Sequence, residues 1–126
     1  MRRVTEGLQA YFITHICYGA FEFIYPQMLQ FTVDNFDLEM SNSGLDMLNL
    51  FKKDKYTKDI SFGAVDVHTH VIEEEPVVEQ RVRDALAVIP IENVWVDPDC
   101  GLKTRSVDEA IEKMKVTVQA AKALRG

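Results

Sequence analysis

The stretch Ser61-Phe62-Gly63-Ala64-Val65-Asp66-Val67 is a short and almost wholly apolar run. Buried strands of parallel sheets have this composition because helices cover their faces. A pattern with the helical period follows at residues 75–88, and its apolar positions fall on one face. The stretch and the pattern together predict one strand–helix unit, with a helix face made of Val78, Val82, Ala85 and Ile89.

Further units of the same kind are predicted on both sides of this one. Apolar runs lie at residues 10–17, 36–40 and 93–96, and helical patterns at 24–30, 44–51 and 107–124. The last pattern starts with a capping box, Ser106 with Glu109. Its apolar stripe is Ile111, Met114, Val118 and Ala121. Such alternation predicts an α/β fold with a parallel sheet.

Four strand–helix units are half of a (βα)₈ barrel, whose usual length is about 250 residues. The short segment 2–9 before the first run is expected to be the end of a preceding helix. The chain, residues 1–126, is therefore predicted to be a single domain that forms the second half of such a barrel.

The composition limits the classes of protein to which the chain can belong. It has 126 residues, of which 47% are hydrophobic and 27% charged, as in ordinary globular domains. A net charge of −6 with scattered basic residues argues against nucleic-acid binding. No apolar run is long enough to cross a membrane. The two cysteines do not make a disulfide framework, so we expect a cytoplasmic protein.

The two cysteines also indicate a metal site. His15 and Cys17 are two residues apart in a predicted strand, so their side chains point the same way and form a chelating pair. With Cys100 and one carboxylate, they would complete a tetrahedral zinc site. Polar residues gather at or just past the carboxyl ends of the predicted strands, where parallel α/β proteins build their sites. These residues are His15, Cys17, Glu39, His68 and Cys100.

Four motifs carry a resemblance to a known family. They are the His-x-Cys of residues 14–19, the run Phe36-Asp37-Leu38-Glu39-Met40-Ser41, the run Asp66-Val67-His68-Thr69, and Asp97-Pro98-Asp99-Cys100-Gly101-Leu102-Lys103-Thr104-Arg105. The chain resembles the C-terminal half of the catalytic barrel of cobalamin-independent methionine synthase, and is most similar to its short archaeal and bacterial core forms. The resemblance implies a zinc ion held by His15, Cys17, Glu39 and Cys100.

The same resemblance implies the reaction and the roles of further residues. A methyl group would pass from methyltetrahydrofolate, or from a methylcorrinoid protein, to the zinc-bound thiol of homocysteine. The leaving folate nitrogen needs a proton, and His68 is expected to supply it as general acid or to orient the substrate. Asp66, on the same strand face as His68, could fix the tautomer of its imidazole and lie at the substrate site. Ser41 is expected to bind substrate there too.

Alternative interpretations remain at this point. Cys17 alone would be a buried core residue, Glu39 a solvated or salt-bridged strand-end acid, and His68 a structural histidine. The acid run at residues 73–75 is expected to be a solvated helix start. Another thiol, such as coenzyme M, could replace homocysteine, or the chain could be a non-catalytic zinc-binding fragment.

The missing half of the barrel leads to an expectation about partners. Two open strand edges and an uncovered inner face invite association. We therefore expect a homo-oligomer, most simply a dimer, or pairing with a chain that carries the first half of the barrel.

Overall fold

The structure is a computed structural model that describes residues 1–17, 21–42 and 46–125. Strands alternate with helices along these residues. The strands are β1 (Ile13–Ile16), β2 (Asn35–Glu39), β3 (Asp59–Val65) and β4 (Val94–Pro98). The α-helices are α1 (Arg2–Thr5), α2 (Asp46–Lys53), α3 (Glu75–Leu86) and α4 (Val107–Arg125), and 3₁₀ turns lie at Phe21–Phe23, Gln27–Gln30 and Ile91–Asn93.

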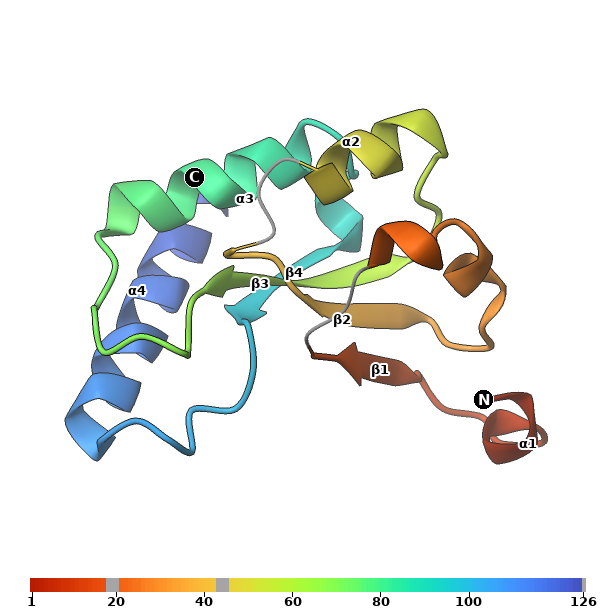
Figure 1. Cartoon of the computed structure of the whole chain (residues 1–126), viewed down its shortest axis with the longest axis horizontal. Helices are drawn as coiled ribbons and strands as arrows, with labels where there is room; N and C mark the ends of the chain where they lie inside the picture. Colours follow the sequence, from red (N-terminus) through yellow and green to blue (C-terminus); the bar gives the residue numbers. More distant parts are fainter. Residues whose placement is uncertain (18–20, 43–45, 126) are drawn as a thin grey trace.

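The four strands form one sheet in the order β1-β2-β3-β4, and all neighbouring strands are parallel (Figure 1). The register places His15 opposite Asp37, and places Gly63 between Glu39 and Asp97. Because side chains alternate along a strand, all five residues lie on one face of the sheet, which we call the inner face. The predicted α/β fold with parallel strand–helix units is confirmed.

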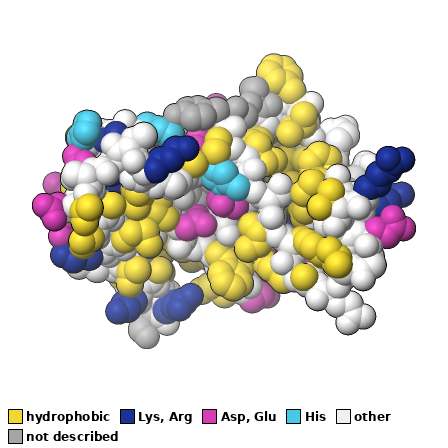
Figure 2. Space-filling model, turned by 90° about the horizontal axis from the view of Figure 1, so that it is seen from below, with side chains coloured by type: hydrophobic (Ala, Val, Ile, Leu, Met, Phe, Trp, Pro, Cys, Tyr) yellow, Lys and Arg dark blue, Asp and Glu magenta, His cyan; other side chains and the backbone are white. Residues whose placement is uncertain are grey.

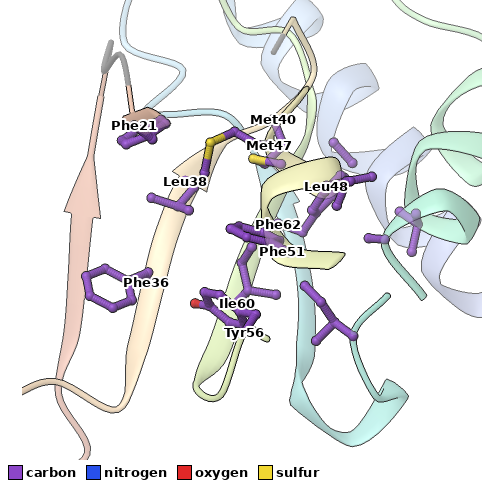
Figure 3. Packing of buried hydrophobic residues seen from close by; sticks show 14 of the residues in the cluster. Phe21, Phe36, Leu38, Met40, Met47, Leu48, Phe51, Tyr56, Ile60 and Phe62 are labelled. Atoms are coloured by element: carbon purple, nitrogen blue, oxygen red, sulfur yellow. The ribbon is translucent and has the colours of Figure 1, made fainter. Parts of the chain in front are cut away.

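The other face of the sheet packs against the helices and carries the hydrophobic core. Phe36 and Leu38 from β2 alternate with the inner-face residues and are 0% exposed. Phe62 from β3 and Phe51 from α2 pack in the same layer (Figure 3). The predicted inward face of this helix is confirmed, because Val78, Val82 and Ala85 of α3 are at most 2% exposed. Ile89, three residues after the end of α3, is also 2% exposed.

Several predicted boundaries differ from the structure. The helix predicted at residues 24–30 is absent, and 3₁₀ turns lie at Phe21–Phe23 and Gln27–Gln30 instead. Pro26 explains this difference, since it lacks a backbone N–H and disfavours helical geometry in the residue before it. The first strand is shorter than predicted, and Asn93 belongs to a turn before β4. Residues 18–19 of the first motif and 44–45 of a predicted helix lie outside the described residues.

The apolar stripe of α4 does not face the core, since three of its four residues are exposed to solvent. Ile111, Met114 and Val118 are 47%, 44% and 45% exposed. They line an open groove of about 770 Å³. Helix α4 has two faces that carry apolar residues, so its period alone could not decide which face turns inward. The residues that α4 buries are Lys113, Val116, Thr117 and Ala120.

The acid run before α3 is also not a simple solvated helix start. The side chain of Glu73 is only 10% exposed, and its carboxylate accepts hydrogen bonds from Arg81 (3.1 Å) and Lys113 (3.2 Å). Lys113 is 0% exposed and also donates to the carbonyls of Asp66 and Val71. This buried ion pair therefore holds the loop between β3 and α3, which carries His68.

Within the described residues, none of the helices combines the length and the apolar character needed to cross a membrane.

Candidate metal centre

Four side chains of the types that can bind a metal meet at the carboxyl edge of the sheet. One donor atom from each of His15, Cys17, Glu39 and Cys100 lies within 4.8 Å of the donor atoms of the other three. His15 is in β1, and Cys17 is the first residue after that strand. Glu39 ends β2, and Cys100 lies in the loop after β4. The parallel arrangement brings these strand ends to one edge, so residues far apart in sequence converge.

The site lies on the side of the molecule that the helices α2 and α3 leave open. Histidine and acidic side chains lie together near the middle of that side, between groups of hydrophobic side chains (Figure 2). Cys17 is exposed, and Cys100 is partly exposed. A small ion or a thiol can therefore reach the four side chains from solvent.

The short distances between the donor atoms show that the side chains of the cluster converge on one point. His15 Nε2 lies 2.6 Å from Cys17 Sγ, and Cys17 Sγ lies 3.4 Å from Cys100 Sγ. Both cysteines are free. One imidazole nitrogen, two sulfurs and one carboxylate oxygen make up a donor set that suits a tetrahedral zinc ion. The residues present therefore fit the zinc site that the sequence predicts.

The two thiols influence each other's ionisation. Desolvation, together with the hydrogen bond to Cys100, raises the pKa of Cys17 to about 11. The hydrogen bond from Cys17 lowers the pKa of Cys100, so the first proton leaves from Cys100. Desolvation lowers the pKa of His15, but hydrogen bonds and the charges of Cys100 and Asp37 outweigh it and raise that pKa overall.

Asp37 is a neighbour of the cluster that the sequence analysis did not single out. Its Oδ2 lies 2.7 Å from His15 Nδ1, directly across the β1–β2 pair. A signal for it was present in the sequence, since Asp37 is two residues before Glu39 and must share its strand face. The partner could not be found from sequence, because it depends on the register of β1 against β2.

The loop that carries Cys100 is fixed to the end of β2 by Asp99. This side chain is 1% exposed, and its Oδ1 accepts hydrogen bonds from the backbone N–H groups of Met40 and Ser41, both at 3.0 Å. The Ser41 hydroxyl donates to Asp99 Oδ2. The hydroxyl therefore has a structural partner, and substrate binding by Ser41 stays a prediction.

His68 lies beside the cluster of four side chains. Its Nε2 is 3.4 Å from Glu39 Oε1. The Asp66 carboxylate accepts a hydrogen bond from the backbone N–H of His68, at 2.7 Å. Desolvation raises the pKa of Asp66, but hydrogen bonds from Asn42 and from His68 outweigh it and lower that pKa overall. Asp66 thus holds the backbone at His68, and its role at the substrate stays a prediction.

The inner face carries a further acid close to the site. Asp97 lies opposite Gly63 in the register. Burial and the nearby charge of Asp37 raise the pKa of Asp97 to about 7. Its Oδ1 is buried and has no hydrogen-bond partner among the described residues.

The fold and the cluster define a class: parallel α/β proteins that gather nitrogen, sulfur and carboxylate donors at the carboxyl edge of the sheet. The chain belongs to the family described as "Cobalamin-independent synthase, Catalytic domain", whose sequence model matches residues 3–123. The resemblance predicted from the motifs is therefore confirmed.

Two relatives with similar sequences carry the same name. The chain is 39% identical over 112 residues to the 5-methyltetrahydropteroyltriglutamate--homocysteine methyltransferase of Neisseria meningitidis serogroup C. It is 42% identical over 112 residues to the protein of that name from Haemophilus influenzae. Each alignment covers 89% of this chain but only 15% of the relative. The chain therefore corresponds to a small part of these longer proteins.

Solved structures agree with the fold. A B12-independent methionine synthase from Shewanella sp. W3-18-1, in complex with selenomethionine, superposes with a TM-score of 0.86 at 25% identity. The match covers 99% of this chain and 41% of that one. A putative vitamin-B12 independent methionine synthase from Listeria monocytogenes shares the fold, with a TM-score of 0.66 at 20% identity. The strand–helix units therefore correspond to part of a larger (βα)₈ barrel.

Proposed function

We propose that this chain provides the zinc-binding part of a methyltransferase that methylates the thiol of homocysteine to give methionine. The observation that carries the proposal is the set of four donor atoms within 4.8 Å of one another at the sheet edge. Membership of the family and the names of the relatives supply the reaction class. The thiol ligands require a reducing compartment, so the proposed location is the cytoplasm.

His15, Cys17, Glu39 and Cys100 would hold the zinc ion. Bound there, zinc would lower the pKa of a substrate thiol and so supply the thiolate that acts as nucleophile. The protein's part is to gather the donors at one point and to leave the site open to solvent on one side. Glu39, the only oxygen donor of the four, is the ligand that we expect to make room for substrate.

His68 is the proposed general acid. Its imidazole lies 3.4 Å from Glu39 Oε1, next to the site where the thiol would bind. From there it would deliver a proton to the nitrogen that loses the methyl group. Asp66 and Ser41 are proposed to line the same site, held by the loop bonds described above.

The proposed methyl donor is a methylated folate, because the relatives' name contains 5-methyltetrahydropteroyltriglutamate. A methylcorrinoid protein is the alternative donor. Another thiol, such as coenzyme M, is the alternative acceptor, because the donor set activates any thiol in the same way. Methyl transfer assays with each pair of substrates distinguish these cases.

The proposed partner is a polypeptide that carries the remaining strand–helix units of the barrel. Trp95 of β4 is 57% exposed and Ile13 of β1 is 55% exposed, and the register places both on the inner face of the sheet. The exposed residues Ile111, Met114 and Val118 of α4 form a second apolar surface, and the groove that they line is also lined by basic side chains: Lys103, Arg105, Lys115 and Lys122. Burying such surfaces is the usual driving force for association.

A second candidate function follows from the coverage. The chain aligns with only 15% of its relatives' length. A non-catalytic zinc-binding chain would keep the four donors and lack turnover on its own.

Zinc content and turnover test the proposal together. We expect one zinc ion per chain after purification without chelators, and loss of zinc in Cys100→Ser. Thr104→Ser, in the same loop, is the matched control and should keep zinc. Methyl transfer is then measured for the chain alone and with a chain that carries the remaining units. Methyl transfer that occurs only when the two chains are mixed supports the proposed partner. Methyl transfer by this chain alone, together with dimers in sedimentation, supports a second copy of this chain as the partner.

The outcomes separate the candidate functions. Zinc binding without turnover in either arrangement favours the non-catalytic chain. An absence of zinc in the unaltered chain overturns the metal site itself.

A further inference from the structure

The proposed function gives no role to the contact between His15 and Asp37. Asp37 Oδ2 lies 2.7 Å from His15 Nδ1, on the side of the ring away from Cys17. The two residues face each other in the β1–β2 register, so the backbone ladder sets their spacing. Their side chains are 33% and 23% exposed, so water only partly competes for this bond.

The contact determines which ring nitrogen is free to bind a metal. A neutral imidazole has one N–H donor and one acceptor nitrogen. A carboxylate only accepts, so Nδ1 carries the proton when it is bonded to Asp37. Nε2 is then the acceptor, and it is the nitrogen that lies 2.6 Å from Cys17 Sγ.

We infer that Asp37 is the positioning residue of this metal centre, holding the His15 ring and its Nδ1–H tautomer so that Nε2 is the ligand atom. The inference rests on the proposed zinc site and adds to it a residue that touches no substrate. Carboxylates that accept from a ligating histidine orient the ring and raise its basicity, and their loss typically weakens metal binding by roughly 10- to 100-fold.

Asp37 is well placed for this task. Strand β2 is paired on both sides, with β1 and with β3, so its backbone cannot shift independently. An asparagine at this position can present either its oxygen or its NH₂ group to the ring. The NH₂ group would favour the wrong tautomer. Asp37→Asn therefore tests charge and tautomer while keeping the size of the side chain.

The experiment has two readouts on the full chain. In the metal-free protein, ¹⁵N NMR of the histidine rings reports which nitrogen of His15 carries the proton. Zinc affinity is measured by competition with a chromophoric chelator. We expect the Nδ1–H form in the unaltered chain, a mixture of forms in Asp37→Asn, and zinc affinity lower by roughly 10- to 100-fold. Asp37→Glu keeps a carboxylate and should restore part of the Nδ1–H form and part of the zinc affinity.

Asp108→Asn, at an exposed acid of α4, is the matched control and should change neither readout. An Nδ1–H tautomer and zinc affinity that are unchanged in Asp37→Asn would overturn the inference. If the unaltered chain binds no zinc, the proposed function fails, whereas the tautomer readout still decides the role of Asp37. Cobalt substitution adds a spectroscopic check, since a changed ring ligand alters the absorption bands of the ion.

Discussion

Asp99 fixes the position of Ser41: its carboxylate accepts both the backbone N–H and the hydroxyl of that residue. Ser41 comes two residues after Glu39, and Asp99 comes directly before Cys100. One buried carboxylate therefore connects the end of the second strand, which carries Glu39, to the loop that carries Cys100. The spacing of these two proposed ligands is thus set by the fold without a metal.

Gly63 makes this arrangement possible, and we expect Gly63→Ala to disrupt it. A Cβ at this position would lie 2.7 Å from Asp99 Cα and 2.8 Å from the Leu38 carbonyl oxygen. Both are backbone atoms, so the loop must move, at a cost of about 1–3 kcal/mol in the free energy of unfolding. Urea unfolding and zinc affinity should both fall. Gly101→Ala is the control, because a Cβ there meets nothing within 4 Å. Equal effects of the two variants would contradict the prediction.

Asp97 should make the stability of the metal-free protein depend on pH. Burial raises its pKa to about 7 in the folded protein, above the usual value of 3.8. Between these values the folded state holds a proton that the unfolded state has lost, so the free energy of unfolding falls as pH rises from about 4 to about 7. Asp97→Asn should therefore gain stability over the unaltered chain with rising pH.

We expect this gain to reach at least about 1 kcal/mol near pH 8, less than the full linkage value because solvent reaches part of the side chain. Urea unfolding in the presence of a chelator, at about pH 4.5 and about pH 8, measures it. The same measurement on Asp108→Asn is the control. A difference between Asp97→Asn and the unaltered chain that stays constant with pH would be evidence against the ionisation of Asp97.

The buried Lys113–Glu73 pair should be costly to break. Lys113 is 0% exposed and bonds to Glu73 and to two carbonyls of the β3–α3 loop. Lys113→Met leaves these acceptors without their donor and should lower the free energy of unfolding by about 3 kcal/mol. Lys115→Met removes an exposed pair with Glu112 and should cost less than about 1 kcal/mol. Similar losses in the two variants would show that the buried pair adds little.

Oxidation should link the two cysteines in the metal-free protein. Their sulfurs lie 3.4 Å apart, and both are accessible. Diamide would take two electrons and two protons from the two thiols, so the disulfide form weighs about 2 Da less. Mass spectrometry after alkylation detects it. Bound zinc should protect both thiols, and Cys100→Ser should give no intramolecular product. Two thiols that still react fully with the alkylating agent would contradict the prediction.

Much of the fold could be predicted because local patterns and packing agree. The apolar run that became β3 and the inward face of α3 follow directly from composition and period. The Ser106–Glu109 capping box forms as predicted, with Ser106 N–H donating to Glu109 at 2.8 Å and Glu109 N–H donating back at 3.2 Å. These features depend on residues close in sequence, so the sequence alone contains them.

The errors arise where long-range contacts decide. Helix α4 offers two apolar faces, and its packing against α3 and β4 selects the one around Val116. Glu73 lies in an acid run that is typical of a solvated helix start. It is nevertheless mostly buried, because it pairs with Lys113, which is far away in sequence. Asp37 was missed for the same reason, because only the strand register shows that it meets His15.

The four donors lie at the ends of the first and second strands and in the loop after the fourth, so they enclose most of the chain between them. An ion bound to all four would close a long covalent and coordinate loop from His15 to Cys100. Because the four donors meet only in the folded sheet, the ion would bind the folded chain and leave on unfolding, so its binding free energy would add to the free energy of unfolding. The concentration of available metal would then set the stability of the sheet.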